Sequence, residues 1–421
     1  MTNFLPPSYI RTIEIDDLFG ESNIRIERSP SADPRVIVLY GKNGTGKTTI
    51  LKIITSLLSA ETNAGHRSRL ANIPFSRASI TLDGGVQVEA KKKEGMLGAF
   101  DWTLRKPNSQ ISIHIKAVGR NGRVRVSDWP PETQARYQQI TEEIHSIIPQ
   151  VVFLDDKRTF YVEDARVRSA HMRGVDTDDL HQDEDPVHEG LRAITNSVRR
   201  EALILSNRGN QTAQSIYTSL VRGVSAFPQT EPAAGAELQA RLVDLEMKSK
   251  RLSAYGLVAV AEHGELLSAL EAADDRALPL VKAVLDPYVK SLSARLSAIE
   301  ALHNHLHAWV TNINTFIEPK VLSFRIGEEI DIKKDGKSPI PVHLLSSGER
   351  HLLLLMTRAF HLRTTGGLMI VDEPELSLNS GWQRGLIAGL VDGFGSAPCQ
   401  MVVASHSLEI CSQYQNQVAF I

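Results

Sequence analysis

Hydrophobic positions in the first third of the chain follow the spacing of β-strands. Val36–Leu39 is a continuous apolar run, which is typical of a strand buried on both faces. Apolar and polar residues alternate over Ala78–Leu82 and Val86–Val88, on either side of the turn sequence Asp83-Gly84-Gly85. This arrangement predicts an antiparallel pair of strands. A second continuous run, Val151–Leu154, predicts a later buried strand.

From about residue 160 the spacing of hydrophobic residues becomes helical. Between Val289 and Ile317 they recur at alternating intervals of three and four residues, which is the pattern of a coiled-coil seam. Asp286 and Pro287 predict the N-cap and first turn of this helix, and Pro319 follows its end. The seam positions are Val289, Leu292, Leu296, Ile299, His303, Leu306, Val310, Ile313 and Ile317, and a shorter partner helix is predicted through Leu238, Leu242, Leu245 and Leu252.

The final part of the chain returns to short strands and helices. Buried strands are expected at Leu368–Val371 and Met401–Ala404, with helices between them, which predicts a partly parallel α/β sheet. We therefore expect an α/β fold with an inserted helical domain. The predicted divisions are a first lobe at 1–158 that includes an antiparallel β subdomain, a helical insertion at 159–320 with a short coiled-coil hairpin, and a second lobe at 321–421.

Composition narrows the class of protein. With 421 residues, 42% of them hydrophobic, the chain is long enough for two or three domains. The 47 Lys and Arg against 49 Asp and Glu give a net charge of −2, which argues against indiscriminate binding of nucleic acid. The two cysteines, Cys399 and Cys411, argue against an oxidised framework and a thiolate metal site. We expect a cytoplasmic protein without membrane contact, because neither a secretory signal nor an apolar run of roughly 20 residues is visible.

The strongest chemical signal is a phosphate-binding loop directly after Val36–Leu39. Its pattern is G-x-x-x-x-G-K-[ST], and a helical sequence follows. In such a loop backbone N–H groups surround the phosphates, Lys47 reaches the β and γ phosphates, and Thr48 ligates Mg²⁺. We therefore expect ATP and Mg²⁺ as cofactors. The predicted nucleotide-binding residues of the loop are Gly41, Lys42, Asn43, Gly44, Thr45, Gly46, Lys47, Thr48 and Thr49.

Two acids end the apolar run Leu368–Val371. Asp372 is expected at the carboxyl end of this strand, where its carboxylate would hold the metal together with Thr48. Glu373 follows and is expected to polarise the water that attacks the γ-phosphate. The predicted metal ligands are therefore Thr48 and Asp372, and Glu373 is a predicted catalytic residue.

A third motif, L-S-S-G-E, begins at Leu345 and leads directly into a leucine-rich helix. Its serines and backbone N–H groups would form a helix N-terminus suited to an anion. Taken alone, the same residues are also what an ordinary helix cap requires. The candidate nucleotide-binding residues of this motif are Ser346, Ser347, Gly348 and Glu349.

The order of these motifs carries a family resemblance. The phosphate loop, L-S-S-G-E, the D-E-P-E of Asp372–Glu375 and Ser405-His406 follow one another as they do in the ABC-type ATPase head, and the chain resembles that family. The resemblance implies an ABC-type P-loop fold and a catalytic switch role for His406. It also implies a D-loop at Ser377-Leu378-Asn379. Two heads would dimerise around two ATP molecules, with Ser346–Gly348 of one subunit contacting the γ-phosphate held by the other.

Within that superfamily the chain is similar to the OLD-like group, related to the RecF and SMC-type ATPases, over about 1–58 and 320–421. That group includes the ATPase subunits of the Septu and PARIS anti-phage systems. The similarity implies a homodimer or higher homo-oligomer that responds to a trigger, DNA or phage-derived, and controls a separate effector subunit, a nuclease. Two alternatives stay open: a DNA-clamping repair ATPase, and a scaffold that holds ATP and turns it over slowly.

Two motifs fit this assignment less directly. Gln150 precedes its predicted strand, so Asp155 or Asp156 is the alternative at the position of a Q-loop glutamine. His303-Asn304-His305 spells the name of the H-N-H nucleases, but here it lies inside the helical seam rather than in a ββα metal fold. We therefore expect no nuclease centre in this chain.

Two charged groups have more than one interpretation. The first group consists of His and Asp residues between 171 and 188. A solvated loop is favoured over a cation site for this group, because its candidate ligands lack regular spacing. The second group consists of Lys and Arg residues between 91 and 125. It is equally compatible with a surface that contacts a nucleic-acid phosphate backbone and with a basic face of a solvated sheet. The first group is His171, Asp176, Asp178, Asp179, His181, Asp183, Asp185 and His188, and the second is Lys91, Lys92, Lys93, Arg105, Lys106, Arg120, Arg123 and Arg125.

Overall fold

The computed structural model divides the chain into two compact units. One unit is formed by residues 1–186 together with 345–421, and the other by residues 187–344. The first unit is therefore built from two distant segments of sequence. The structure describes residues 9–62, 64–93, 95–117, 123–155, 185–223, 234–272 and 278–421.

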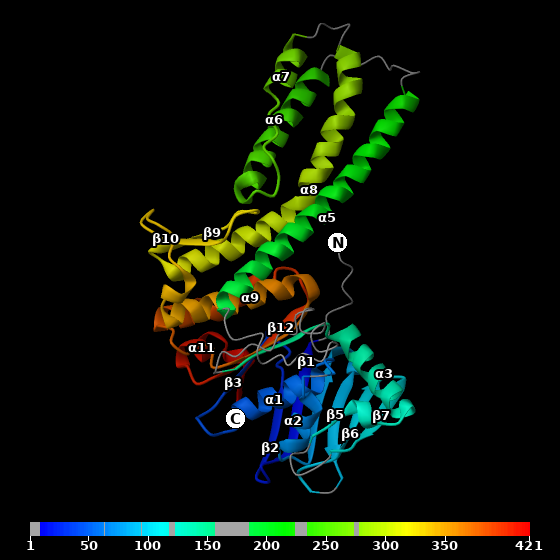
Figure 1. The fold of residues 1–421 in the computed structure, drawn as a ribbon, viewed down its shortest axis with the longest axis vertical. Helices are drawn as coiled ribbons and strands as arrows, with labels where there is room; N and C mark the ends of the chain where they lie inside the picture. The colour runs from blue at the N-terminus through cyan, green and yellow to red at the C-terminus, as the bar shows by residue number, and fades with distance from the viewer. Residues whose placement is uncertain are drawn as a thin grey trace. The chain divides into compact units, whose positions relative to one another are not determined.

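A six-stranded antiparallel sheet forms one part of the first unit (Figure 1). The expected hairpin is confirmed, because strands at 77–82 and 87–92 pair antiparallel around a single 3₁₀ turn at Asp83–Gly85. Ile13, Ile80 and Val88, which lie opposite one another on neighbouring strands, are all buried, as one covered face requires. The strand order is β2 (Ser22–Glu27), β1 (Ile10–Leu18), β4 (Arg77–Leu82), β5 (Gln87–Lys92), β6 (Phe100–Lys106) and β7 (Ser109–Ile115).

A five-stranded sheet forms the other part of this unit, and all its pairs are parallel. The predicted α/β fold is confirmed. Because the strands are parallel, their carboxyl ends lie along one edge, and the segments that follow β3, β11 and β12 meet there. The order is β13 (Val418–Phe420), β3 (Val36–Tyr40), β12 (Cys399–Ser405), β11 (Gly367–Asp372) and β8 (Val151–Leu154).

Helices cover the two sheets. The helix after the phosphate loop buries Ile50, Ile53 and Ile54 in one hydrophobic cluster with the antiparallel sheet. The helix after L-S-S-G-E is buried on nearly every side, which explains its run of leucines. The helices of this unit are α1 (Lys47–Leu58), α2 (His66–Asn72), α3 (Pro131–Ile147), α9 (Ser347–Thr365), α10 (Ser380–Gly393) and α11 (Leu408–Gln413).

A buried arginine joins α1 to the antiparallel sheet. The guanidinium of Arg67 lies 3.7 Å from the ring centre of Trp102 in β6 and donates to the carbonyl oxygens of Ser56 and Ser59 at the end of α1. A cation is favourable at this end of a helix because the last carbonyls carry partial negative charge. Burial lowers the pKa of Arg67. The helix that begins at the phosphate loop is thus fixed at its far end.

The second unit is mainly helical. Helix α6 lies along α8 (Figure 1), and the leucines expected on the partner helix form one buried cluster with Val289, Leu292 and Leu296. All nine seam positions between Val289 and Ile317 are buried. The elements are α5 (Pro186–Gly223), α6 (Ala234–Leu252), α7 (Gly264–Glu271), α8 (Leu278–Ile317), β9 (Lys320–Ser323) and β10 (Asp331–Lys334).

The predicted start of the long helix is wrong. Helix α8 begins at Leu278 and continues through Pro287. Asp286 does not cap a helix there; its carboxylate pairs with Arg241 of α6 at 2.8 Å and with Lys290 at 2.9 Å. These ion pairs and the leucine packing stabilise a helix that lacks the N–H of Pro287.

The helical unit ends later than the boundary drawn at residue 320. Strands β9 and β10 pair with each other and belong to this unit, which reaches Leu344. Asn314 of α8 explains why: its Oδ1 accepts from Leu322 N at 2.7 Å and its Nδ2 donates to Leu322 O at 3.1 Å. The strand is therefore attached to the helix that precedes it.

Candidate functional site

The phosphate loop lies between β3 and α1, where its sequence predicted it. Gly44 and Gly46 have φ angles of 89° and 90°, a region that side chains with a Cβ rarely adopt. Gly41 is required for space, because a Cβ there would lie 2.8 Å from Thr45 Oγ1 and 2.9 Å from Ile421 O. Thr45 Oγ1 donates to Lys42 O at 3.0 Å and closes the loop.

Lys47 is held inside this loop. Its side chain emerges from the first residue of α1, the residue is only 5% exposed, and Nζ donates to Gly41 O at 2.6 Å and Lys42 O at 3.0 Å. These hydrogen bonds hold the ammonium group of Lys47 against the start of the phosphate loop. An anion bound by the backbone N–H groups at the start of α1 would meet this charge directly.

Thr48 and Asp372 meet although 324 residues separate them in sequence. Thr48 Oγ1 donates to Asp372 Oδ2 at 2.5 Å, and Asp372 is 3% exposed at the end of β11. The parallel order β3-β12-β11 produces this meeting by aligning the carboxyl ends of the strands. A hydroxyl and a carboxylate oxygen are hard ligands of the kind that Mg²⁺ prefers. The residues therefore fit a Mg²⁺ ion at this position.

Glu373 and His406 lie side by side at the same sheet edge. Glu373 N donates to Ala404 O at 2.8 Å, which ties the residue after β11 to the end of β12. His406 Nδ1 is 3.8 Å from Glu373 Oε1 and 3.1 Å from Glu375 Oε1. The carboxylate of Glu373 and the imidazole are 27% and 48% exposed, so both remain accessible to a ligand at the phosphate loop.

Sequence reasoning gave Glu375 no role of its own. The structure shows it buried, with Oε1 accepting hydrogen bonds from Ser405 Oγ, His406 N and Ser407 N at 2.7, 2.8 and 3.2 Å. A second acid two residues after Glu373 was the available signal. The donors to Glu375 lie about 30 residues later in the chain. They could be identified only once the order of the strands in the sheet was known.

The L-S-S-G-E motif forms the predicted start of a helix. Ser346 is the N-cap of α9 and forms a capping box with Glu349: Ser346 N and Oγ each donate to Glu349 Oε2 at 2.8 Å. Glu349 is buried in this role, whereas Ser346 and Ser347 are exposed. The two serines are thus presented outward, and the acid that was expected to bind nucleotide stabilises the helix end.

Gly348 brings this helix end against the turn at Ser377, where the D-loop is expected. A Cβ on Gly348 would lie 2.5 Å from Ser377 O, and Ser377 has a φ of 65°. The contact is possible only for glycine, because a carbonyl oxygen cannot approach a Cβ so closely.

Gly348→Ala is expected to lower the free energy of unfolding by about 1–3 kcal/mol, the usual cost of overpacking. The added methyl must displace either the first turn of α9 or the turn at Ser377. Urea unfolding monitored by tryptophan fluorescence measures the change. Gly264→Ala is the control, because a Cβ there meets nothing within 4 Å and no loss is expected. Equal stability of both variants would contradict the close approach.

The family profile described as "AAA domain, putative AbiEii toxin, Type IV TA system" matches residues 36–412. The match runs from β3 to α11 and so includes the phosphate loop, the L-S-S-G-E motif with α9, and the acids Asp372 and Glu373. The chain belongs to this AAA-domain family. No curated protein matches it.

Among solved structures, this AAA-domain protein is similar to SMC head domains. One, from Pyrococcus furiosus with an extended coiled coil and bound to the C-terminal domain of ScpA, has a TM-score of 0.41 and 13% identity over 97% of this chain and 92% of that chain. Another, the SMC head domain from Thermotoga maritima, has a TM-score of 0.34 and 11% identity over 96% of this chain and 91% of that chain. The narrower resemblance to Septu and PARIS subunits stays a prediction.

The two described residues considered for a Q-loop, Gln150 and Asp155, lie at opposite ends of β8. Gln150 lies at the amino end of β8, where Thr365 Oγ1 donates to its Oε1 at 2.9 Å and Leu368 N donates to its carbonyl. Because β8 and β11 are parallel, Gln150 is at the edge opposite Asp372. Asp155 follows β8 at the correct edge, and Asp156 lies outside the described residues.

Most of the acidic group lies outside the described residues, namely His171, Asp176, Asp178, Asp179, His181 and Asp183. Of the other two, Asp185 pairs with Arg350 Nη2 at 2.9 Å and His188 lies in α5. Within the described ranges, no three His, Cys, Asp or Glu side chains are grouped so that they could hold a metal ion. His303 is buried in α8, where its ring stacks on that of His307.

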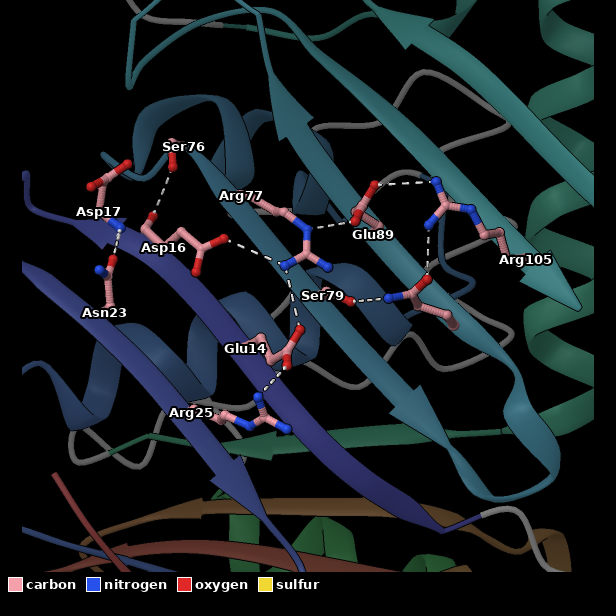
Figure 2. Close-up of polar contacts among 11 residues, drawn as sticks. Glu14, Asp16, Asp17, Asn23, Arg25, Ser76, Arg77, Ser79, Glu89 and Arg105 are labelled. Carbon is pink, nitrogen blue, oxygen red and sulfur yellow. Dashed lines mark hydrogen bonds and ion pairs between the residues drawn. The ribbon is translucent and has the colours of Figure 1, made fainter.

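Three arginines of the antiparallel sheet are paired with acids. Figure 2 shows them in an alternating row across the strands: Arg25 is 3.7 Å from Glu14, Arg77 is 3.4 Å from Glu14 and 2.7 Å from Glu89, and Arg105 is 3.8 Å from Glu89. Opposite charges on neighbouring strands support the sheet register. This face therefore presents mixed charge rather than a basic surface.

Three lysines in or beside this sheet, Lys92, Lys93 and Lys106, also have partners. Lys92 is buried over the ring of Phe75 and donates to carbonyl oxygens of the chain, and burial lowers its pKa to about 8. Lys93 pairs with Asp101, and Lys106 pairs with Glu143. Arg120 lies outside the described residues. Lys92 cannot contact a phosphate backbone, and that part of the nucleic-acid interpretation is wrong.

No helix in the part of the chain that the structure describes combines the length and the apolar character needed to cross a membrane.

Proposed function

We propose that this chain is a Mg²⁺-dependent ATPase whose heads dimerise through ATP and thereby control a separate effector. The observation that carries the proposal is the 2.5 Å contact between Thr48 of the phosphate loop and Asp372 at the end of β11. It joins a phosphate-binding helix N-terminus to an oxygen ligand for the metal that accompanies ATP. Hydrolysis of ATP by the purified chain, dependent on Mg²⁺ and on both residues, is the primary test.

The chain's own residues divide the work of hydrolysis. The loop amides and Lys47 bind the phosphates, while Thr48 and Asp372 would hold Mg²⁺, which would supply positive charge against the phosphates. Glu373 accepts the proton of the attacking water, because its carboxylate is accessible beside the loop. His406 lies next to Glu373 and contacts the γ-phosphate. Asp155, which follows β8, or Asp156 after it would support the metal shell in place of a Q-loop glutamine.

Dimerisation is supported by the exposure of Ser346 and Ser347 at the start of α9. Ser346 caps the helix and Ser347 begins it, so both lie where an anion from another subunit could approach the first turn. In this arrangement each ATP contacts the phosphate loop of one protomer and the serines of its partner. The interface closes only while ATP is bound.

Ser346→Arg is expected to leave ATP binding intact and to block hydrolysis, since a bulky cation replaces the serine offered to the partner's γ-phosphate. Mixing this variant with Lys47→Ala tests action in trans, because one composite site then contains both intact residues. In an equimolar mixture about half of the dimers are mixed, and each of these has one intact site out of two. Hydrolysis should therefore recover to about a quarter of the wild-type rate if the subunits pair randomly and the sites work independently. A mixture as inactive as each variant alone would contradict the composite site.

Control of an effector in anti-phage defence is the part of the proposal that rests on resemblance. The family's description names a toxin of a TA system, which supports a chain whose nucleotide state restrains or releases a toxic activity. The effector is expected to be a nuclease on a separate polypeptide in the cytoplasm, and the trigger to be DNA or phage-derived. Purification of the native complex followed by mass spectrometry identifies both. Recovery of chromosome-cohesion or repair factors instead would favour the DNA-clamping alternative, and slow turnover with ATP-dependent dimers would favour the scaffold.

A further inference from the structure

The turn after β11 contains a buried carboxylate that the proposed reaction does not use. The side chain of Glu375 is 4% exposed, and Oε1 accepts hydrogen bonds from Ser405 Oγ, His406 N and Ser407 N. Burying a charge is costly unless hydrogen bonds compensate for lost water. All three donors belong to the segment that carries His406. Glu375 therefore fixes the backbone on both sides of this histidine.

The same oxygen is the nearest acid to the imidazole. Glu375 Oε1 lies 3.1 Å from His406 Nδ1, closer than Glu373 Oε1 at 3.8 Å. A carboxylate in contact with one imidazole nitrogen orients the ring, so that the other nitrogen is directed to the ligand. His406 is about half exposed. Nε2 is thus the nitrogen available to a phosphate.

The turn that follows β11 contains strained backbone conformations. Glu373 and Ser377, on either side of Glu375, have φ angles of 49° and 65°. Residues other than glycine rarely adopt this region, and such conformations persist where the surrounding structure imposes them, often at functional sites. The hydrogen bonds that Glu375 accepts from residues 405–407, together with the bond from Glu373 N to Ala404 O, hold this turn against the end of β12.

We propose that Glu375 is a positioning residue that acts through His406, orienting its imidazole for hydrolysis without contributing to nucleotide binding. The inference rests on the proposed ATPase function. Among the described residues, the hydrogen bonds of the Glu375 carboxylate all go to residues 405–407 and none to the phosphate loop. Its removal should therefore change kcat and leave KM in place.

Glu375→Gln is the first test, since it keeps the size and one acceptor oxygen but removes the charge. Charge-assisted hydrogen bonds are about twice as strong as neutral ones, so kcat is expected to fall about 10-fold to 100-fold while KM changes less than about twofold. Glu409→Gln is the matched control, because that carboxylate is partly exposed and pairs with Arg384 at 2.7 Å. It should retain the wild-type kcat.

A double-mutant cycle separates positioning from general structural support. If Glu375 acts through His406, Glu375→Gln combined with His406→Ala hydrolyses ATP at the single-turnover rate of His406→Ala alone. Losses that multiply in the double variant overturn the inference, as does an unchanged kcat in Glu375→Gln. If Glu375→Gln does not fold, Ser405→Ala serves in its place, because it removes one of the donors to Glu375 Oε1. Ser405→Ala should lower kcat by a smaller factor, and this decrease must be absent when His406→Ala is also present. Absence of hydrolysis by the wild-type protein would instead contradict the proposed function itself.

Discussion

Lys47→Ala is expected to abolish detectable ATP binding. The ammonium group is buried at the mouth of the phosphate loop, held by Gly41 O and Lys42 O, where it meets the phosphates as they bind the loop amides. Charge-assisted hydrogen bonds are worth about 1.5–3 kcal/mol each, so loss of two weakens affinity by about 10²- to 10⁴-fold. Isothermal titration calorimetry with ATP and Mg²⁺ measures this change.

Lys52→Ala is the control for this experiment. Lys52 also lies in α1 and carries the same charge, but it is one turn beyond the loop. Its replacement should leave the affinity within about twofold of the wild type. Equal affinity of Lys47→Ala and wild type would remove the phosphate-loop assignment and, with it, the ATPase proposal.

Glu373→Gln is expected to slow hydrolysis by roughly 10²-fold or more while ATP and Mg²⁺ stay bound. The proposed metal ligands are Asp372 and Thr48, which contact each other, and Glu373 is not one of them. ATP should therefore accumulate at the interface and stabilise the dimer. Single-turnover hydrolysis and size-exclusion chromatography with ATP measure the two effects.

Glu132→Gln provides the comparison, because that carboxylate is exposed on α3 and pairs only with Arg136 in the ion pairs of this helix. It should hydrolyse ATP at the wild-type rate. If Glu373→Gln does the same, another group must be the base. Loss of ATP binding in Glu373→Gln would show instead that the acid supports the metal.

Local motifs were predictable from the sequence because their residues are adjacent. The loop from Gly41 to Thr48 and the helix cap at Ser346 need only a few neighbouring residues to form. The approach of Asp372 to Thr48 was also predictable, because an acid that ends a buried parallel strand must lie at the edge where phosphate loops lie.

Features that depend on distant partners were not predictable. Asp286, followed by Pro287, has the residue type expected of an N-cap. However, α8 begins eight residues earlier at Leu278, and the carboxylate of Asp286 pairs with Arg241 on another helix. Lys92 belongs to a basic run, but packing over Phe75 buries it. Glu375 acquires its donors only when β12 is placed between β3 and β11. Tertiary contacts decide each case.

The position of β12 between β3 and β11 also determines when the nucleotide site can form during synthesis. Strand β3 ends at Tyr40, and both of its neighbours, β12 and β13, begin at residue 399 or later. At a translation rate of about 5–20 residues per second, the apolar strand Val36–Tyr40 waits roughly 20–70 seconds on the ribosome before either partner emerges. During that interval its edges are open to incorrect pairing. The long helical unit between them has time to fold first, so a nascent chain would carry a finished helical unit well before it can bind ATP.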